Sequence, residues 1–377
     1  MSIKVLYIIP EFGFGGAEKF LINLVKALKR TEQIEPKIVF LFEKNLPKYS
    51  YIECVNVNVR LSLFRKNKIF VDELINVVKS FEPNIIHSHI FYAELISRAN
   101  LFKGIKYISH IHGITTQYEK FPSHGFFKLK SYTNFYEKKY ILKQYKICDN
   151  KFIVVSKQLK KYLVQNIGVK ESTVEVFHNA IDLNKFKPQT SKKSKKLKLI
   201  SIGRLDKNKG HDLLINVVKE LQATFKEIEL KILGEGSQRP ALEALIKTLQ
   251  LEKNVFLMGN IENPQTHLQK ADVFLHASKY ESFGIVFLEA MACGVPIITT
   301  NGEGNMDITM PNYNSIVVDR NTVDFTNAVV SIMENKKEYE KIRANGLSFV
   351  KKYHICEYAS RLIEYYKDII ENDKRKI

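Results

Sequence analysis

Two glutamates with a defined spacing are the first candidates for chemistry in this 377-residue chain. Residues 278–300 read SKYESFGIVFLEAMACGVPIITT, in which seven residues separate Glu281 from Glu289. If both lay on one helix, they would be roughly 12 Å apart along its axis. The paired carboxylates of glycosidases lie only about 5 to 9.5 Å apart. The spacing therefore disfavours a hydrolytic acid/base pair and suits the two ends of one extended ligand.

The same segment predicts an anion site at the start of a helix that begins near Gly284. The backbone amides of Phe283, Gly284 and Ile285 would have no partner within the helix, so they would face a phosphate. Glu289, further along the helix, would accept hydrogen bonds from two vicinal hydroxyls such as those of a ribose. A favourable interaction with the helix dipole is the simpler explanation for acidic residues in this segment, but it accounts at most for Glu281.

Cations follow the first strand of the second half of the chain. In ISIGRLDKNKGHDLL, Gly203 and Arg204 come directly after the strand, and Lys209 comes five residues later. A guanidinium and an ammonium that converge over a glycine turn suit a diphosphate, although solvated surface cations are the alternative. A second strand, turn and helix in ILGEGSQRPALEALI adds Gly234 as a candidate for close ligand approach.

The segment GFGGAEKF places Gly15 and Gly16 between the first strand and a helix, where backbone amides favour an anion. A dinucleotide fingerprint would need a small residue at position 18, where this chain has Glu18, so a dehydrogenase is disfavoured. A tight turn that binds no ligand stays open.

Four histidines lie at predicted strand ends, in IIHSH and ISHIHG: His87, His89, His110 and His112. Their alternation places each pair on one face of a strand, which raises the question of a metal. Without a neighbouring carboxylate or cysteine, we expect no metal site and no cofactor. His112, directly before a glycine, is the better candidate for contact with a polar substrate, and a structural hydrogen bond is the alternative.

Composition indicates a folded protein, with 45% hydrophobic and 26% charged residues. The four cysteines are scattered and no run of eighteen apolar residues occurs, so we expect a cytoplasmic protein without disulfides, structural zinc or a membrane span. The net charge of +18 is uneven. Residues 1–183 hold 28 Lys/Arg against 16 Asp/Glu, whereas residues 199–377 hold 23 against 24. A basic first half indicates anionic partners, although simple solubility would also explain it.

Apolar strand-like runs alternate with helical patterns along the chain, which predicts an α/β protein with parallel sheets. The lysine-rich residues 184–198 interrupt this alternation and read as a basic linker. We therefore expect a doubly wound domain over 1–183, a second over 199–353, and a C-terminal helix over 354–377 that crosses back to the first domain.

Taken in order, GFGGAE, HG, NAID, GRLDKNKG, ILGEG and ESFGIVFLEAMACGVPIITT resemble the retaining GT-B glycosyltransferases of family 4 over nearly the whole chain. The resemblance implies two Rossmann-like domains that face a cleft, and sugar transfer from a nucleotide diphosphate donor without metal.

The resemblance also implies a role for each matching residue. Arg204 and Lys209 would bind the donor diphosphate beside Gly203 and Gly234, while Glu289 would hold the ribose. Glu281 and the amides of residues 283–285 would hold the transferred sugar. Gly15 and Gly16 would approach the donor phosphate, and His112 would contact the sugar near the reacting carbon. The catalytic set is then His112, Arg204, Lys209 and Glu281.

In such enzymes the first domain binds the acceptor. Here residues 121–146 intersperse Phe and Tyr with six lysines and one glutamate, which is typical of a helix at a membrane surface. We expect docking to the acidic inner face of the plasma membrane, with a glycan or lipid-linked acceptor in bacterial lipopolysaccharide, capsule or O-antigen synthesis. A helix packed on its own domain is the alternative for this segment.

Other function classes fit less well. A nucleotide-sugar epimerase on the same fold remains an alternative that would need no acceptor, whereas a phosphorylase would need a cofactor lysine site that we do not find. The charge alone suggests a nucleic-acid-binding protein, but no such module is visible and no nucleic acid is expected as a partner.

Overall fold

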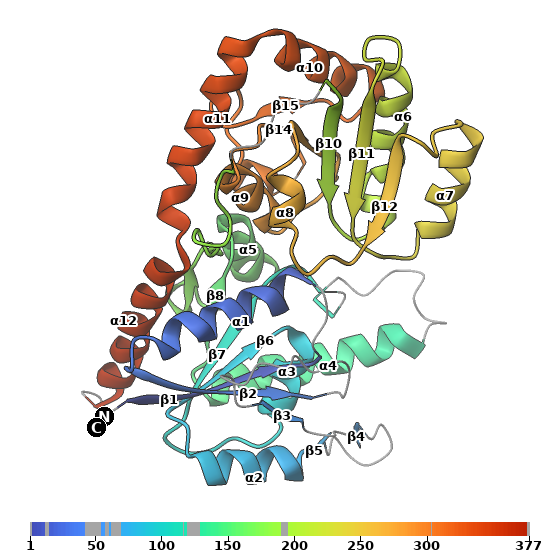
Figure 1. Cartoon of the computed structure of the whole chain (residues 1–377). Helices are drawn as coiled ribbons and strands as arrows, with labels where there is room; N and C mark the ends of the chain where they lie inside the picture. Colours follow the sequence, from blue (N-terminus) through green and yellow to red (C-terminus); the bar gives the residue numbers. More distant parts are fainter. Residues whose placement is uncertain are drawn as a thin grey trace. The chain divides into compact units, whose positions relative to one another are not determined.

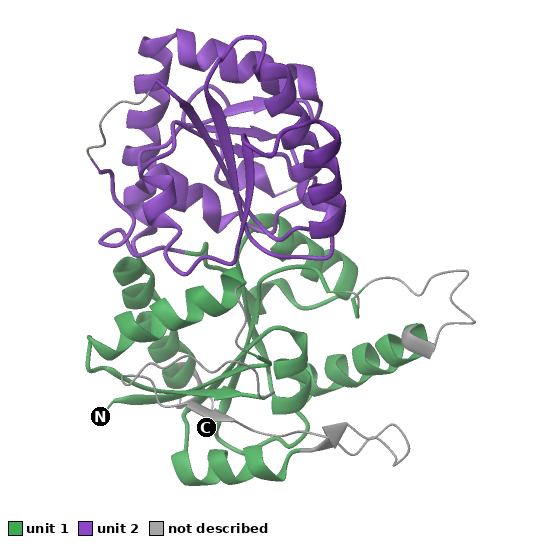
Figure 2. Cartoon of the chain, turned by 45° about the vertical axis from the view of Figure 1, so that its right-hand side comes forward, with its two compact units in different colours: residues 1–179, 355–377 green, residues 180–354 purple. Residues whose placement is uncertain are grey.

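The structure is a computed structural model of the chain (Figure 1). It describes residues 2–11, 15–41, 54–56, 60–61, 69–115, 117–118, 129–189, 195–302 and 304–374. The chain divides into two compact units, coloured separately in Figure 2: unit 1 is residues 1–179 with 355–377, and unit 2 is residues 180–354.

Unit 1 is built on a parallel sheet with the strand order β3-β2-β1-β6-β7-β8-β9. Its strands are β1 (Ile3–Ile9), β2 (Ile34–Phe40), β3 (Cys54–Asn56), β6 (Ile85–His89), β7 (Lys106–Ile111), β8 (Lys151–Val154) and β9 (Val174–Val176). The short strands β4 (Arg60–Leu61) and β5 (Ile69–Phe70) pair antiparallel beside it. Because β1 lies between β2 and β6, the chain leaves the sheet in opposite directions there, which is where open α/β sheets bind ligands.

Helices cover both faces of this sheet. They are α1 (Gly16–Lys29), α2 (Asp72–Phe81), α3 (Phe91–Ser97), α4 (Leu129–Ile147), α5 (Lys157–Tyr162) and α12 (Ile355–Lys374). Alternate residues of β1 serve the two faces: Leu6 and Ile8 pack with α2 and α3 residues, whereas the Tyr7 hydroxyl lies 3.0 Å from that of Tyr366 in α12. Helix α12 also packs along α1, so the end of the chain completes unit 1.

A buried arginine ties α3 to the sheet. Arg98 is fully buried, and its guanidinium donates to Asn150 Oδ1 at 2.6 and 3.0 Å, to Ser88 Oγ at 2.8 Å and to Ser109 Oγ at 3.1 Å. These partners come from β6, from β7 and from the residue before β8. A buried cation is tolerated only when its donors are satisfied, and this one is satisfied by side chains of three segments.

Unit 2 repeats the doubly wound plan with the strand order β12-β11-β10-β13-β14-β15. Its strands are β10 (Leu197–Ile202), β11 (Ile228–Leu233), β12 (Val255–Gly259), β13 (Val273–His276), β14 (Ile297–Thr300) and β15 (Ile316–Val318). All of them pair in parallel, so their carboxyl ends share one edge. The two doubly wound parallel-sheet domains expected from the sequence are confirmed.

The helices of unit 2 are α6 (His211–Leu221), α7 (Arg239–Thr248), α8 (Gln265–Leu268), α9 (Ile285–Ala292), α10 (Thr322–Glu334) and α11 (Lys336–Val350). One face of the sheet forms a large apolar core with α6, α7 and α10. On the other face, Phe274 and His276 of β13 make edge contacts with Phe287 of α9. Strand β13 therefore sends alternate side chains to two helical layers.

The boundary between the units differs from the prediction. We expected the first domain to end at 183 and a linker over 184–198, but unit 2 begins at Ala180 and β10 already at Leu197. The reason is local: the Ile181 amide donates to the Tyr353 carbonyl at 2.9 Å, which ties this segment to the end of unit 2. Residues 190–194 of the predicted linker lie outside the described residues.

Replacing Arg98 by Met should destabilise unit 1 by about 3 kcal/mol or more, because several buried oxygens lose their donor. Arg30→Met, at an exposed position, should change stability by less than about 0.5 kcal/mol. Urea unfolding followed by far-UV circular dichroism measures both, since the chain has no tryptophan to report by fluorescence. Equal midpoints for the two variants would contradict the role given to Arg98.

Candidate functional site

The loop after β10 and the glycine turn after β11 pack directly on each other. The Leu205 amide donates to the Glu235 carbonyl at 2.9 Å. A Cβ on Gly236 would lie 2.6 Å from the Leu205 oxygen, and one on Gly234 would overlap the Gly203 carbonyl. Gly234 also has a φ of +144°, which side chains rarely adopt. Gly234 and Gly236 are therefore required by packing at this sheet edge, whether or not a ligand approaches them.

Arg204 has a fixed backbone and an exposed side chain. The buried ring of His211 donates from Nε2 to the Arg204 carbonyl at 3.2 Å, and burial lowers the pKa of His211 to about 4. The Arg204 side chain is 76% exposed and pairs with Asp206 at 3.0 Å. A surface ion pair of this kind contributes little, so the guanidinium is available to an anionic ligand.

Lys209 and Glu281 form a largely buried ion pair, and His276 joins it by a hydrogen bond. Lys209 ends a short 3-10 turn (Lys207–Lys209) after β10, and its ammonium contacts Glu281 Oε1. The same oxygen lies 2.8 Å from Nε2 of His276, the last residue of β13. The side chains are 18%, 15% and 1% exposed respectively. One carboxylate thus joins the loops that follow two neighbouring strands.

The protonation of Glu281 follows from these contacts. Burial raises the pKa of Glu281, but the hydrogen bond with His276 and the attraction of His276 and Lys209 outweigh it and lower the pKa to about 2. Glu281 is therefore an anion at neutral pH. It is unsuited to donate a proton and well suited to hold a cation or accept hydroxyl hydrogen bonds.

The helix after this cluster begins near Gly284, as predicted, so the two glutamates do not lie on one helix. Helix α9 begins at Ile285, after Gly284 with a φ of +70°, so Glu281 lies in the loop before it and only Glu289 is helical. The estimate of 12 Å from helical rise therefore does not apply to this pair. Phe283 is buried and contacts the ring of Tyr353, which fixes the loop at the point where the α9 amides begin.

In unit 1, Gly15 is the N-cap of α1 and Gly16 is its first residue. A Cβ on Gly15 would overlap the carboxylate of Glu18, so this acidic side chain folds back over the start of the helix. Gly13 lies outside the described residues. The helix N-terminus is thus formed as predicted, with Glu18 rather than a small residue beside it.

His112 follows β7 and belongs to a group of four imidazoles. Its Nε2 lies 2.9 Å from Nδ1 of His89, and its ring stacks on that of His110 at 4.3 Å between centroids. Burial lowers the pKa of His112, like that of His87, to about 3, and lowers those of His89 and His110 well below the usual value. All four rings are neutral at physiological pH.

The structure thus gathers the predicted unit 2 residues at the carboxyl ends of β10, β11 and β13. They are Gly203, Arg204, Lys209, Gly234, Glu281, Phe283, Gly284, Ile285 and Glu289. In unit 1, Gly15, Gly16 and His112 lie beyond the ends of β1 and β7. Sequence reasoning missed His276, although a histidine that ends the apolar run ADVFL was a visible signal.

Comparison with protein families assigns both halves of the chain. Residues 14–185 match the family described as Glycosyltransferase Family 4, and residues 182–349 match Glycosyl transferases group 1. Together the two matches span nearly all the residues discussed above. The chain belongs to the family 4, group 1 glycosyltransferases.

The relatives that are named for an activity are between 25% and 35% identical to this chain over the aligned residues. The chain is 25% identical over 311 residues to the GPI3 subunit of phosphatidylinositol N-acetylglucosaminyltransferase from Saccharomyces cerevisiae, covering 78% of this chain and 65% of the relative. It is 35% identical over 185 residues to the Campylobacter jejuni N-acetylgalactosamine-N,N'-diacetylbacillosaminyl-diphospho-undecaprenol 4-alpha-N-acetylgalactosaminyltransferase, covering 48% and 49%. The chain spans less than two thirds of the length of these relatives.

Among solved structures, Anabaena Alr3699/HepE in complex with UDP-glucose matches over 97% of this chain and 100% of its own, with a TM-score of 0.79 and 18% identity. At this identity the likeness concerns the fold. It identifies the two doubly wound units as the GT-B architecture.

Replacing Glu281 by Gln should remove a pH-dependent part of the stability of unit 2. Because the pKa of Glu281 is lower in the folded protein than in the unfolded chain, its contribution is complete above about pH 4.5 and is lost as the pH falls toward 2. We expect a loss on the order of 3 kcal/mol at pH 7 and a much smaller one near pH 2.5. Urea unfolding at both pH values measures it, and a loss that does not depend on pH would contradict the ion cluster.

Proposed function

We propose that this protein is a retaining hexosyltransferase that moves a sugar from a nucleotide diphosphate donor to a glycan or lipid-linked acceptor. The observation that carries the proposal is the cluster of Lys209, Glu281 and His276 beside exposed Arg204, at the carboxyl ends of β10 and β13. Family membership supplies the reaction class, and the cluster supplies residues suited to a donor that is anionic at one end and rich in hydroxyls at the other.

In the proposed donor complex, Arg204 and Lys209 bind the diphosphate. Glu289, in the second turn of α9, accepts hydrogen bonds from the ribose hydroxyls. Glu281 and the amides at the start of α9 hold the transferred sugar. Lys209 and the amides at the start of α9 are fixed before the donor arrives, so they stabilise charge on the leaving diphosphate without reorganisation. The reaction proposed here uses no cofactor.

The configuration at the anomeric carbon is retained because the acceptor attacks from the same face of the sugar as the one from which the diphosphate departs. The acceptor hydroxyl oxygen forms a bond to the anomeric carbon as the bond from that carbon to the diphosphate oxygen breaks. The hydroxyl proton passes to the departing phosphate oxygen, so atoms and charge balance without an enzymic nucleophile. The low pKa of Glu281 agrees with a binding role, because an anion already shared with Lys209 and His276 is a poor nucleophile.

We propose further that the acceptor is membrane-bound and that α4 docks on an anionic membrane surface. The buried residues Ile141 and Tyr145 pack into unit 1. The exposed residues recur at helical spacing on the opposite side of α4: Tyr132, Phe135, Tyr136, Lys139, Lys143, Lys146 and Ile147. Aromatic rings next to ammonium groups suit the headgroup region of a bilayer.

Helix α4 thus agrees with both interpretations of residues 121–146, because one face packs on its own domain and the other face is exposed for contact with a membrane. Residues 119–128 lie outside the described part. No helix of the described residues has the length and apolar character to cross a bilayer. The two curated relatives described above are named for acceptors that carry lipid. These observations support a place in bacterial cell-surface polysaccharide synthesis.

The donor assignment is tested by thermal shift with uridine, guanosine and adenosine diphosphate sugars. At 100 times its dissociation constant, the matching donor should stabilise the protein by about 2.7 kcal/mol. Glu289→Ala should abolish this shift, whereas Glu220→Ala, at an exposed position of α6, should retain it. If none of the nucleotide sugars shifts the melting temperature, the donor site is refuted. Consumption of the nucleotide sugar in the absence of an added acceptor would favour an epimerase.

Membrane docking is tested by flotation with vesicles of phosphatidylcholine alone or mixed with phosphatidylglycerol. Replacing Lys139, Lys143 and Lys146 by Gln should weaken binding to anionic vesicles roughly 100-fold, at about 1 kcal/mol per lysine. A control with the same charge change replaces Lys219, Lys247 and Lys270, which are exposed lysines of unit 2, and should bind normally. Equal recovery of the unmodified protein with neutral and anionic vesicles would refute the docking.

A further inference from the structure

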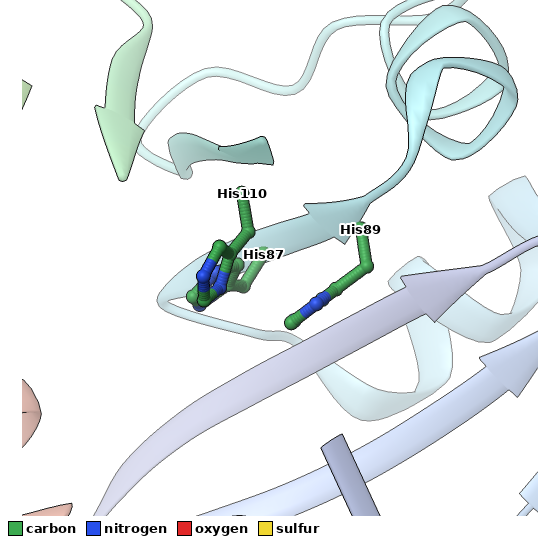
Figure 3. Close-up of side chains that lie close together, drawn as sticks. All are labelled: His87, His89 and His110. Atoms are coloured by element: carbon green, nitrogen blue, oxygen red, sulfur yellow. The ribbon is translucent and has the colours of Figure 1, made fainter. Parts of the chain in front are cut away.

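Three fully buried imidazoles meet on one face of the unit 1 sheet. His87 and His89 alternate along β6, and His110 of β7 is in register with His89. Figure 3 shows the rings of His87 and His110 side by side with that of His89 reaching toward them. One ring nitrogen from each lies within 4.8 Å of the others. The two strands therefore bring together three groups that commonly bind metals.

Four nitrogens of these three rings have no hydrogen-bond partner among the described residues. His87 Nδ1 lies 2.5 Å from the Tyr366 hydroxyl, and His89 Nδ1 lies 2.9 Å from His112 Nε2. Among the described residues, neither Nε2 atom has a hydrogen-bond partner, and neither nitrogen of His110 has one. A buried polar atom without a partner costs about 1 to 3 kcal/mol, so four of them at one place call for a ligand.

We propose that His87, His89 and His110 bind a divalent transition metal ion, with zinc as the best match. Imidazole nitrogens are preferred zinc ligands, and three of them with one water form a common tetrahedral set. In such a set neighbouring nitrogens are roughly 3.4 Å apart. The three rings lie 4.7 to 5.3 Å apart between centroids and are stacked or tilted on one another, so they must turn their nitrogens toward a common point to bind the ion. His87 and His89 have at Nδ1 the partners that a metal-binding histidine requires, because such partners fix the ring and its tautomer, whereas His110 has none among the described residues.

The ion has a consequence for His112. A metal at Nε2 of His89 leaves the proton on Nδ1, so His89 donates to Nε2 of His112. The proton of His112 is then on its Nδ1, and this ring can present a donor to a sugar hydroxyl. The ion is thus a positioning element next to the expected substrate contact, and it takes no part in the phosphate chemistry assigned to unit 2. This departs from the expectation, drawn from the sequence, of no metal site.

The test uses the full chain without a polyhistidine tag, stripped with EDTA. Addition of Zn²⁺ should restore one tightly bound ion per chain after gel filtration, measured by elemental mass spectrometry, and should raise the melting temperature. Co²⁺ in its place should give the intense visible absorption of a tetrahedral site. If no ion is retained and the melting temperature is unchanged, the proposal is overturned, and buried water is then the partner of these nitrogens.

Variants localise the ion. His89→Gln and His110→Gln should each lose the bound ion and the cobalt absorption, whereas His267→Gln in unit 2 should retain both. Circular dichroism confirms folding of each variant, and the unmodified protein with and without Zn²⁺ gives a comparison that needs no variant. Retention of the ion in both cluster variants would also refute the site. Thermal shift with the nucleotide sugar is measured alongside, so that failure of the metal site and failure of the donor site are distinguished.

Discussion

Parallel strand pairing places the carboxyl ends of all the main strands at one edge of each sheet, and both groups of candidate residues depend on it. In unit 2, β10 lies between β11 and β13, so the loops that follow these three strands meet although they are far apart in sequence. Lys209 and Glu281 come into contact for this reason. In unit 1 the same pairing brings two histidines of β6 next to a third on β7.

The two cations of unit 2 are held in different ways. The ammonium of Lys209 is largely buried and fixed by Glu281, whereas the Arg204 guanidinium is exposed and makes a surface pair with Asp206. Because the Lys209 ammonium is already held in place, little free energy is needed to orient it when a diphosphate binds. The exposed Arg204 guanidinium can instead adapt to the geometry of the diphosphate. In the proposed site, Lys209 therefore sets the position of the diphosphate and Arg204 closes on it.

The strands were predictable because buried parallel strands are continuous apolar runs, as in KVLYII and KLISI. The glycine turns were predictable as well, but the reason for Gly234 was not, since its neighbour Gly203 belongs to the loop after another strand. The start of α9 near Gly284 was also predictable, and it places Glu281 in the turn before the helix, so the distance estimate for two glutamates on one helix does not apply. His276 was missed because its contact with Glu281, five residues further along the chain, depends on the conformation of the turn between them. The alternation of the histidines predicted a shared face, but the register that groups them is set by the whole sheet.

Helix α12 is part of unit 1, but it is synthesised after unit 2. Tyr366 contacts both Tyr7 and His87, and α12 covers α1, yet residues 355–374 are translated after all of unit 2. While the ribosome makes unit 2, the face of unit 1 that carries the histidines is covered by α1, whose Phe20 contacts His110, but it still lacks α12. Unit 2 is continuous and can finish folding during translation, whereas unit 1 must wait for the last helix. Until α12 is made, the part of this face that α12 covers stays exposed in the nascent chain, where a chaperone can protect it.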